Sequence, residues 1–224
     1  MTLGGVERAA EFAGLGLQQV TISGHRFTAD TDIYAALDLQ GARTLLTFDA
    51  RAARARLEQL PWIARASIER LMPDGIDVHV TERVPFAVWR VGEQSWLIDR
   101  DGRKLQTAPA DVMPRLLRVA GEGAPKEAAA LAALLVDFPH IARRVEFAQR
   151  VGGRRWRLNV AGGGSIDLPA TGEAEALARL TRLFESGLPG AKGIDVRAST
   201  RVLVRGLDSA ATAERGPAAP AGRT

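Results

Sequence analysis

The chain has 224 residues, enough for one large domain or two small ones. Its hydrophobic fraction of 46% is that of a folded globular protein, and the absence of cysteine excludes disulfides, thiolate metal sites and a cysteine nucleophile. The 30 basic residues exceed the 26 acidic ones by four, and all but three of the basic residues are arginines. No apolar run approaches the about 18–20 residues of a membrane span.

The first half of the chain alternates between short strand and helix signals. Residues 1–14 carry no core-forming pattern, and we expect a linker there. The elements that the pattern predicts follow in this order: a strand over 17–23, a helix over 28–39 capped by Thr28 or Asp30, a helix capped by Asp49 and closed by Pro61, a strand over 63–71, and a strand over 76–81. This β-α-α-β-β order fits a small sheet with two helices on one face.

Pro85 interrupts the pattern and marks the expected boundary with a second domain. That domain reads mostly as strand, with two helices. Its predicted elements are strands over 86–89, 95–98 and 103–106, a helix over 125–138, strands over 144–150, 154–160 and 165–168, a helix over 173–186, and strands over 193–197 and 201–205. We therefore expect an α+β protein whose second domain has a curved, mostly antiparallel sheet and two helices, and a disordered tail over 207–224.

Signals for catalysis or metal binding are weak. The three histidines are far apart in sequence, and His79 alternates with aliphatic residues, which predicts a solvent-facing side chain. Ser165 follows a glycine run that is neither a nucleophile elbow nor a phosphate loop, so a hairpin turn is the better interpretation. Asp99 and Asp101 lack the other ligands of a calcium loop, and we expect their carboxylates to accept hydrogen bonds from nearby amides in a turn. No metal or cofactor is expected.

The arginine clusters do not favour nucleic acid. Arg51, Arg54 and Arg56 share one predicted helix, and residues 154, 155 and 157 share one predicted strand. Nucleic-acid binding would call for a basic groove with interleaved aromatic residues, and aromatics are only 5% of the chain. Solvated faces, or a patch that meets protein or lipid, are the preferred interpretations. The last predicted strand, if it ends a sheet, offers unpaired backbone groups that a partner strand can use.

Six short motifs occur along the chain. They are Val-Thr-Ile-Ser-Gly at 20–24, Leu-Pro-Trp-Ile at 60–63, Thr-Glu-Arg-Val-Pro-Phe-Ala-Val-Trp at 81–89, Leu-Ile-Asp at 97–99 with Gly102, Met-Pro-Arg-Leu at 113–116 with Gly121, and Ile-Asp-Val-Arg at 194–197. In these motifs the chain resembles the extracytoplasmic part of the bacterial cell-division family FtsQ/DivIB. The resemblance covers residues 15–206 in the right order, and its most specific parts are 60–63 and 82–89.

The resemblance implies a POTRA domain over 15–84 and a β domain over 85–206, preceded by a membrane helix upstream of residue 1. Such proteins are single-pass proteins of the inner membrane, with these domains in the periplasm and concentrated at the division septum. They are not enzymes. They belong to the divisome, bind the FtsB–FtsL pair, and link septum assembly to control of peptidoglycan synthesis. The POTRA domain is associated with recruitment to the division site.

The resemblance also implies a partner-binding site at the end of the β domain, where the last strand pairs with FtsB. The residues carried over by position are Arg154, Arg197, Ala198, Ser199, Thr200, Arg201 and Val202. In this interpretation Arg197 and Arg201 pair with acidic residues of the partner. Ala198 stands where certain relatives have an aromatic residue, so backbone pairing rather than a large side chain would anchor the contact.

Two other functions remain open. One is a POTRA-type assembly or secretion chaperone that binds substrate strands through its first domain, although tandem POTRA repeats and a barrel are not seen in the sequence. The other is a hydrolase, which the lack of an acid–base constellation disfavours.

Overall fold

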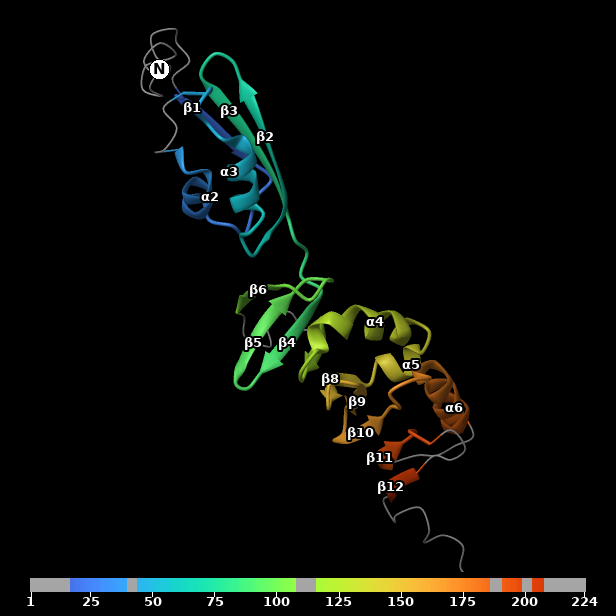
Figure 1. The fold of residues 1–224 in the computed structure, drawn as a ribbon. Coiled ribbons are helices and arrows are strands. Elements are labelled where there is room, and N and C mark those ends of the chain that lie inside the picture. Colours follow the sequence, from blue (N-terminus) through green and yellow to red (C-terminus); the bar gives the residue numbers. More distant parts are fainter. Residues whose placement is uncertain (1–16, 40–43, 108–115, 186–190, 199–202, 208–224) are drawn as a thin grey trace, which may run out of the picture. The chain divides into compact units, whose positions relative to one another are not determined.

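A computed structural model describes residues 17–39, 44–107, 116–185, 191–198 and 203–207. The chain divides into two compact units. The first comprises residues 1–85 together with 97–99 and 103–107, and the second comprises the remainder. Each unit is described by itself (Figure 1).

The first unit has the predicted β-α-α-β-β order. Its elements are β1 (Gln19–Ser23), α2 (Asp30–Leu37), α3 (Ala50–Leu57), β2 (Ile63–Leu71) and β3 (Gly75–Glu82). The sheet order is β1-β3-β2, with β1 parallel and β2 antiparallel to β3. Ile76, Val78 and Val80 of β3 are buried as their alternation predicts, and they pack with Leu37 and Leu57 of the two helices in one core.

The two helix starts of this unit differ in how well the sequence predicts them. Asp49 caps α3 as expected, accepting a hydrogen bond from the backbone N–H of Ala52 at 3.0 Å. The predicted cap of α2 is wrong, because its N-cap is Ala29. The Thr28 hydroxyl instead donates to a Glu82 carboxylate oxygen at 2.8 Å, and Asp30 lies inside the helix, where it pairs with His25.

The chain that follows β3 forms a mixed sheet with helices, most of which belongs to the second unit. Its order, read from one edge, is β12-β11-β10-β9-β8-β7-β4-β5-β6. The strands and helices are β4 (Ala87–Val91), β5 (Gln94–Ile98), β6 (Lys104–Thr107), β7 (Leu117–Ala120), α4 (Ala124–Val136), α5 (Pro139–Ala142), β8 (Val145–Val151), β9 (Arg155–Val160), β10 (Gly164–Asp167), α6 (Glu173–Glu185), β11 (Ala191–Asp195) and β12 (Leu203–Leu207).

The sheet contains both antiparallel and parallel strand pairs. β8–β9, β9–β10 and β11–β12 are antiparallel, whereas β4–β7, β7–β8 and β10–β11 are parallel. The structure adds β7 and the short helix α5, which the sequence did not predict. β7 has only four residues and is parallel to both of its neighbours, so no hairpin turn in the sequence predicts it.

A glycine fixes the corner after β7. Gly121 has φ +95°, and a Cβ built there would lie 2.3 Å from the backbone oxygen of Arg150. Its own carbonyl accepts a hydrogen bond from the Trp89 indole at 3.3 Å. Only glycine satisfies both the left-handed conformation and the close approach of β8.

Candidate partner-binding edge

The second sheet ends at β12, within the part of the chain that the structure describes. β12 pairs antiparallel with β11, with Asp195 opposite Leu203 and Gly193 opposite Arg205. β11 in turn runs parallel to β10. A terminal strand presents backbone N–H and C=O groups on its outer side, and these are available to an added strand.

A continuous apolar row holds the strands that support this edge. In the registers of β8 to β11, Ala148, Leu158, Ile166 and Ile194 lie side by side, and all four are buried. Leu177 and Leu180 of α6 are also buried, as their helical spacing predicts. The Arg179 guanidinium of α6 donates to the carbonyl oxygens of Val196 and Ala198, both at 3.4 Å. The segment that leaves β11 is thereby tied to a helix.

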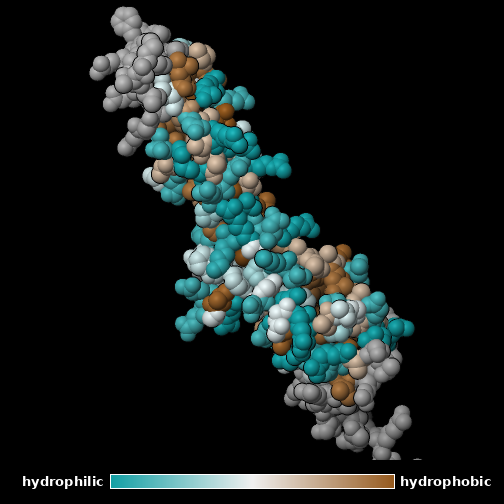
Figure 2. Space-filling view, viewed as in Figure 1, coloured by the Kyte–Doolittle hydropathy of each residue, from teal (hydrophilic) through white to brown (hydrophobic). Residues whose placement is uncertain are grey.

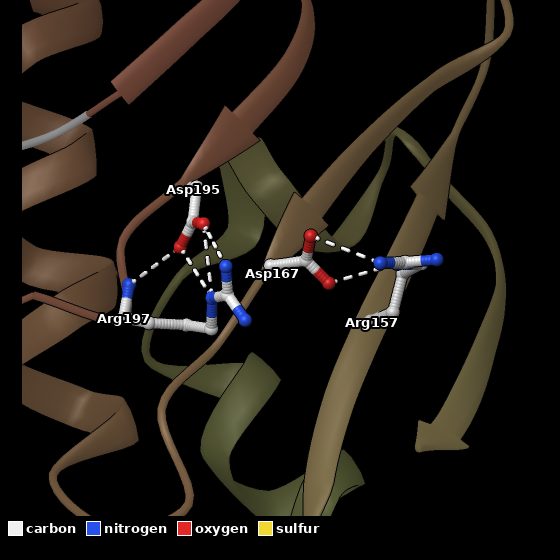
Figure 3. A network of polar contacts seen from close by, with 4 residues as sticks. All are labelled: Arg157, Asp167, Asp195 and Arg197. Atoms are coloured by element: carbon white, nitrogen blue, oxygen red, sulfur yellow. Dashed lines mark hydrogen bonds and ion pairs between the residues drawn. The ribbon is translucent and has the colours of Figure 1, made fainter.

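The opposite face of the same strands carries a row of charges (Figure 3). Arg157 of β9 donates two hydrogen bonds to Asp167 of β10, at 2.8 and 3.1 Å. Asp167 is opposite Asp195 in the parallel β10–β11 register. Asp195 accepts from the Nε of Arg197 at 2.8 and 2.9 Å, and its Oδ1 also accepts from the Arg197 backbone N–H at 3.0 Å. Two acids on neighbouring strands are therefore each neutralised by an arginine.

The carboxylates stabilise the charged form of these guanidiniums, which are protonated in any case. The hydrogen bond and then the charge of Asp167 raise the pKa of Arg157. The hydrogen bonds and charge of Asp195 likewise raise the pKa of Arg197. Both arginine side chains remain accessible, with 40% and 44% of their surface exposed, whereas Asp195 is only 8% exposed. The arginines thus present positive charge at the surface above acids that are largely covered.

The structure describes three of the seven residues predicted for partner binding. Arg197 and Ala198 directly follow β11, and the Arg197 side chain is engaged by Asp195 rather than free. Arg154 is exposed in the β8–β9 turn, one residue before β9 begins, and so is not the first strand residue as predicted. It precedes Arg157 by three residues, about 10 Å along a strand. Ser199, Thr200, Arg201 and Val202 lie outside the described residues.

The acids of the charged row were missed from sequence. Asp195 and Arg197 are two residues apart in the motif Ile-Asp-Val-Arg, and a strand period of two would place them on one face. Asp167 sits in a similar alternation in β10. The available signal was this spacing, whereas the pairing of Asp167 with Arg157 needed the β9–β10 register.

The first sheet has its own edge strand, β2, and a carboxylate occupies part of it. The Glu58 Oε1 accepts a hydrogen bond from the backbone N–H of Ala66 at 3.3 Å and another from the Nε of Arg54 at 2.9 Å. The hydrogen bond from Arg54, and after it the one from Ala66, lowers the pKa of Glu58. This edge is therefore partly closed by a charged side chain.

Other side chains of types that often act in catalysis or binding instead make structural hydrogen bonds. His79 is exposed, as predicted, with its Nδ1 3.1 Å from the Ser23 hydroxyl. The Arg56 guanidinium donates to the carbonyl oxygens of Ala36 and Leu37 at the end of α2. Within the described ranges, no group of three or more histidine and acidic side chains is arranged to hold a metal ion.

The order of these units defines a protein with a POTRA-like unit followed by a mixed-sheet domain, and sequence comparison identifies both parts. The family described as "POTRA domain, FtsQ-type" matches residues 15–83, and "Cell division protein FtsQ/DivIB, C-terminal" matches residues 87–197. The chain therefore belongs to the FtsQ/DivIB family of cell division proteins.

Curated relatives agree with this assignment. The chain is 32% identical to the cell division protein FtsQ of Agrobacterium fabrum over 82% of its length, but spans only 59% of that relative. It is 32% identical to FtsQ of Bartonella bacilliformis over 91% of the chain and 67% of the relative. The FtsQ of Caulobacter vibrioides is 32% identical over 92% of the chain and 69% of the relative.

The family places this chain in the bacterial cell-division machinery and implies a membrane protein. In the part of the chain that is described, the helices are too short or too polar to cross a bilayer.

Proposed function

We propose that this chain is the periplasmic part of a non-enzymatic divisome scaffold that binds the FtsB–FtsL pair by adding a partner strand to β12. The terminal position of β12 in a ladder of strands carries the proposal. Domains over 15–84 and 85–206 follow a linker, and because β12 extends to Leu207 the proposed C-terminal tail begins one residue later than predicted. The full protein is anchored by one helix in the inner membrane, acts at the septum, and links its assembly to peptidoglycan synthesis.

The charged row supports a partner with acidic residues. Arg197, which follows β11, and Arg157, on β9, are exposed on one face of the sheet, and their acids are largely covered. An acidic side chain of the partner would share the guanidinium of Arg197 with Asp195, since an arginine has five N–H donors. Arg154, Ala198, Ser199, Thr200, Arg201 and Val202 complete the proposed contact.

A strand-binding chaperone acting through the first unit is the competing function. The nine residues of β2 form an edge long enough for a substrate strand. The hydrogen bond from Ala66 to Glu58 blocks part of that edge, whereas β12 is the terminal strand of its sheet. The edge at β12 is therefore the better supported docking site.

The test uses proline in β12, with a periplasmic FtsB segment as the titrant. Successive residues of a strand point their backbone N–H groups to opposite sides. Of the two variants Val204→Pro and Arg205→Pro, one therefore removes an N–H group that faces β11, and the other removes an N–H group that faces away from the sheet. Thermal unfolding tells them apart, because the outward variant retains the wild-type melting temperature. We expect this variant to bind FtsB at least about tenfold more weakly. Unchanged affinity in it would refute strand addition.

A second arm leaves the protein unaltered. Two FtsB peptides are made with N-methyl groups at alternate residues, one at the odd and one at the even positions. Each of them lacks the backbone N–H donors on one side of the strand. If the peptide adds as a strand, one of the two loses binding and the other retains it. Equal binding by both methylated peptides contradicts the proposal, and no binding by the unmodified peptide contradicts the choice of partner.

A further inference from the structure

One end of the first unit carries three exposed, large apolar side chains. Leu71 is the last residue of β2 and is 46% exposed, and Met72, which follows it, is 69% exposed. Leu46, in the segment before α3, is 62% exposed. We call these three residues the apolar tip. Brown, hydrophobic atoms are visible at this end of the unit in Figure 2.

Hydrogen bonds fix the two parts of the tip to each other. The Arg70 guanidinium, next to Leu71, donates to the carbonyl oxygens of Leu45 and Phe48 at 3.1 and 2.8 Å. These two carbonyls lie on either side of Leu46 in the chain. The Leu46 segment is therefore tied to the end of β2, so all three residues lie at one end of the unit. Leu71 follows Arg70 in the strand and points to the opposite face of the sheet.

The chain enters the first unit at this same end. The backbone N–H groups of Gln18 and Gln19 donate to the carbonyl oxygen of Asp74 at 2.8 and 3.2 Å, in the turn that follows Met72. A Cβ built on Gly75 would lie 3.3 Å from the Cβ of Leu71 and 3.5 Å from the Cβ of Gln19. Figure 1 shows the start of β1 beside the β2–β3 turn.

We propose that the apolar tip rests in the interfacial layer of a lipid bilayer when the protein is anchored through its N-terminal side. This inference rests on the membrane anchor of the proposed function. The chain enters the first unit beside the tip, so an anchor on the N-terminal side draws this end of the unit, and not the opposite end, toward the membrane. Tethering raises the effective concentration of the tip at the membrane surface, so even weak insertion is populated.

The neighbouring groups set the depth of the contact. Leu and Met side chains gain free energy on leaving water, but Glu69, Arg70 and Asp74 flank them in the sequence. Charged groups cannot follow the apolar side chains into the hydrocarbon layer at low cost. The tip therefore reaches the level of the headgroups and the first acyl carbons, as interfacial anchors do.

The absence of cysteine makes a direct test clean. Met72→Cys gives a single thiol for an NBD fluorophore, and an N-terminal histidine tag tethers the full chain to phosphatidylcholine vesicles containing a nickel-chelating lipid. Val84→Cys is the matched control, because Val84 is apolar, 78% exposed, and about 30 Å away along β3. We expect NBD emission at position 72, but not at 84, to rise and shift to the blue on tethering.

A second variant separates insertion from tethering. With the fluorophore on Leu46→Cys, the additional changes Leu71→Ser and Met72→Ser should lower the equilibrium constant for membrane contact at least about tenfold. No response at position 72, an equal response at 72 and 84, or a response only when another division protein is added would overturn the inference. Because the tag supplies the tether, such a result bears on the tip alone, whereas the FtsB titration tests the proposed function.

Discussion

Substitution of Asp99 should destabilise the first unit by breaking a largely buried ion pair. The residue is 5% exposed, and its Oδ2 accepts a hydrogen bond from the Arg83 guanidinium at 2.7 Å. Its Oδ1 accepts from the Arg103 backbone N–H at 2.8 Å, which confirms that this carboxylate bonds a local amide in a turn. The Arg83 side chain is itself only 17% exposed. Asp99→Asn therefore leaves a mostly buried guanidinium without its counter-charge.

The magnitude follows from that burial. Breaking one partner out of a buried ion pair costs about 3–5 kcal/mol, because the other charge stays buried. Asparagine still offers an oxygen that accepts the hydrogen bond from the Arg103 backbone N–H, and this hydrogen bond retains about 1 kcal/mol of the stabilisation. Arg83 also makes further interactions in the structure. We therefore expect Asp99→Asn to lower the free energy of unfolding by about 2–4 kcal/mol.

Urea unfolding at neutral pH measures this loss. Glu93→Gln, an exposed carboxylate in the β4–β5 turn, is the control and should change stability by less than about 0.5 kcal/mol. Adding Arg83→Gln to Asp99→Asn removes the uncompensated charge, so the double variant should be more stable than the sum of the two single losses predicts. A loss below about 1 kcal/mol in Asp99→Asn, or strictly additive effects, would refute the reasoning.

Three further predictions concern local structure. Burial alone would raise the pKa of Glu82, but hydrogen bonds from Thr28 and from nearby amides outweigh it and lower that pKa. The stability that Glu82 contributes is therefore complete above its ordinary pKa of about 4.3 and is lost as the pH falls through the lowered pKa. In Glu82→Gln, the free energy of unfolding should therefore depend less on pH in that acid range. Asp49→Ala should cost about 1 kcal/mol in urea unfolding, and Asp49→Asn much less. Gly121→Ala should cost about 2 kcal/mol or more, because its Cβ meets a backbone oxygen of β8; an unchanged melting temperature would contradict this.

Local patterns predicted the first unit well because its signals are local. The alternation in β3, the Asp49 cap and the apolar stripe of α3 each act within one turn or one strand. The N-cap of α2 was predicted wrongly, because the Thr28 hydroxyl donates a hydrogen bond to Glu82, 54 residues away. No local rule of helix capping contains that competition.

The second unit was harder because its order depends on parallel pairing. β7 and the parallel pairs on either side of it connect segments distant in sequence, which turn signals do not reveal. The same reason limited the candidate site. Sequence patterns singled out Arg157 within a cluster on one strand and the family resemblance singled out Arg197, but Asp167 joins Arg157 only through the β9–β10 register and lies beside Asp195 only through the β10–β11 register.

The two sheets differ in how their edges meet solvent, and this difference is itself testable. At β2 the Ala66 N–H is satisfied by Glu58, which Arg54 holds in place. Since the pKa of Glu58 is lowered, mainly by the hydrogen bond from Arg54, the guard stays ionised throughout the neutral range. Removing it should open the edge to solvent and to strand addition.

Glu58→Ala should therefore speed hydrogen exchange at the Ala66 amide, while amides of β3, which pairs on both sides, stay protected. Arg51→Ala, on the same helix but exposed, is the control and should leave the Ala66 amide unchanged. Exchange at Ala66 that is equally slow in both variants would mean that the carboxylate is not what closes this edge. In that case the preference for β12 as the docking strand would rest on its terminal position and on Arg197 after the neighbouring strand β11, and not on a guard at β2.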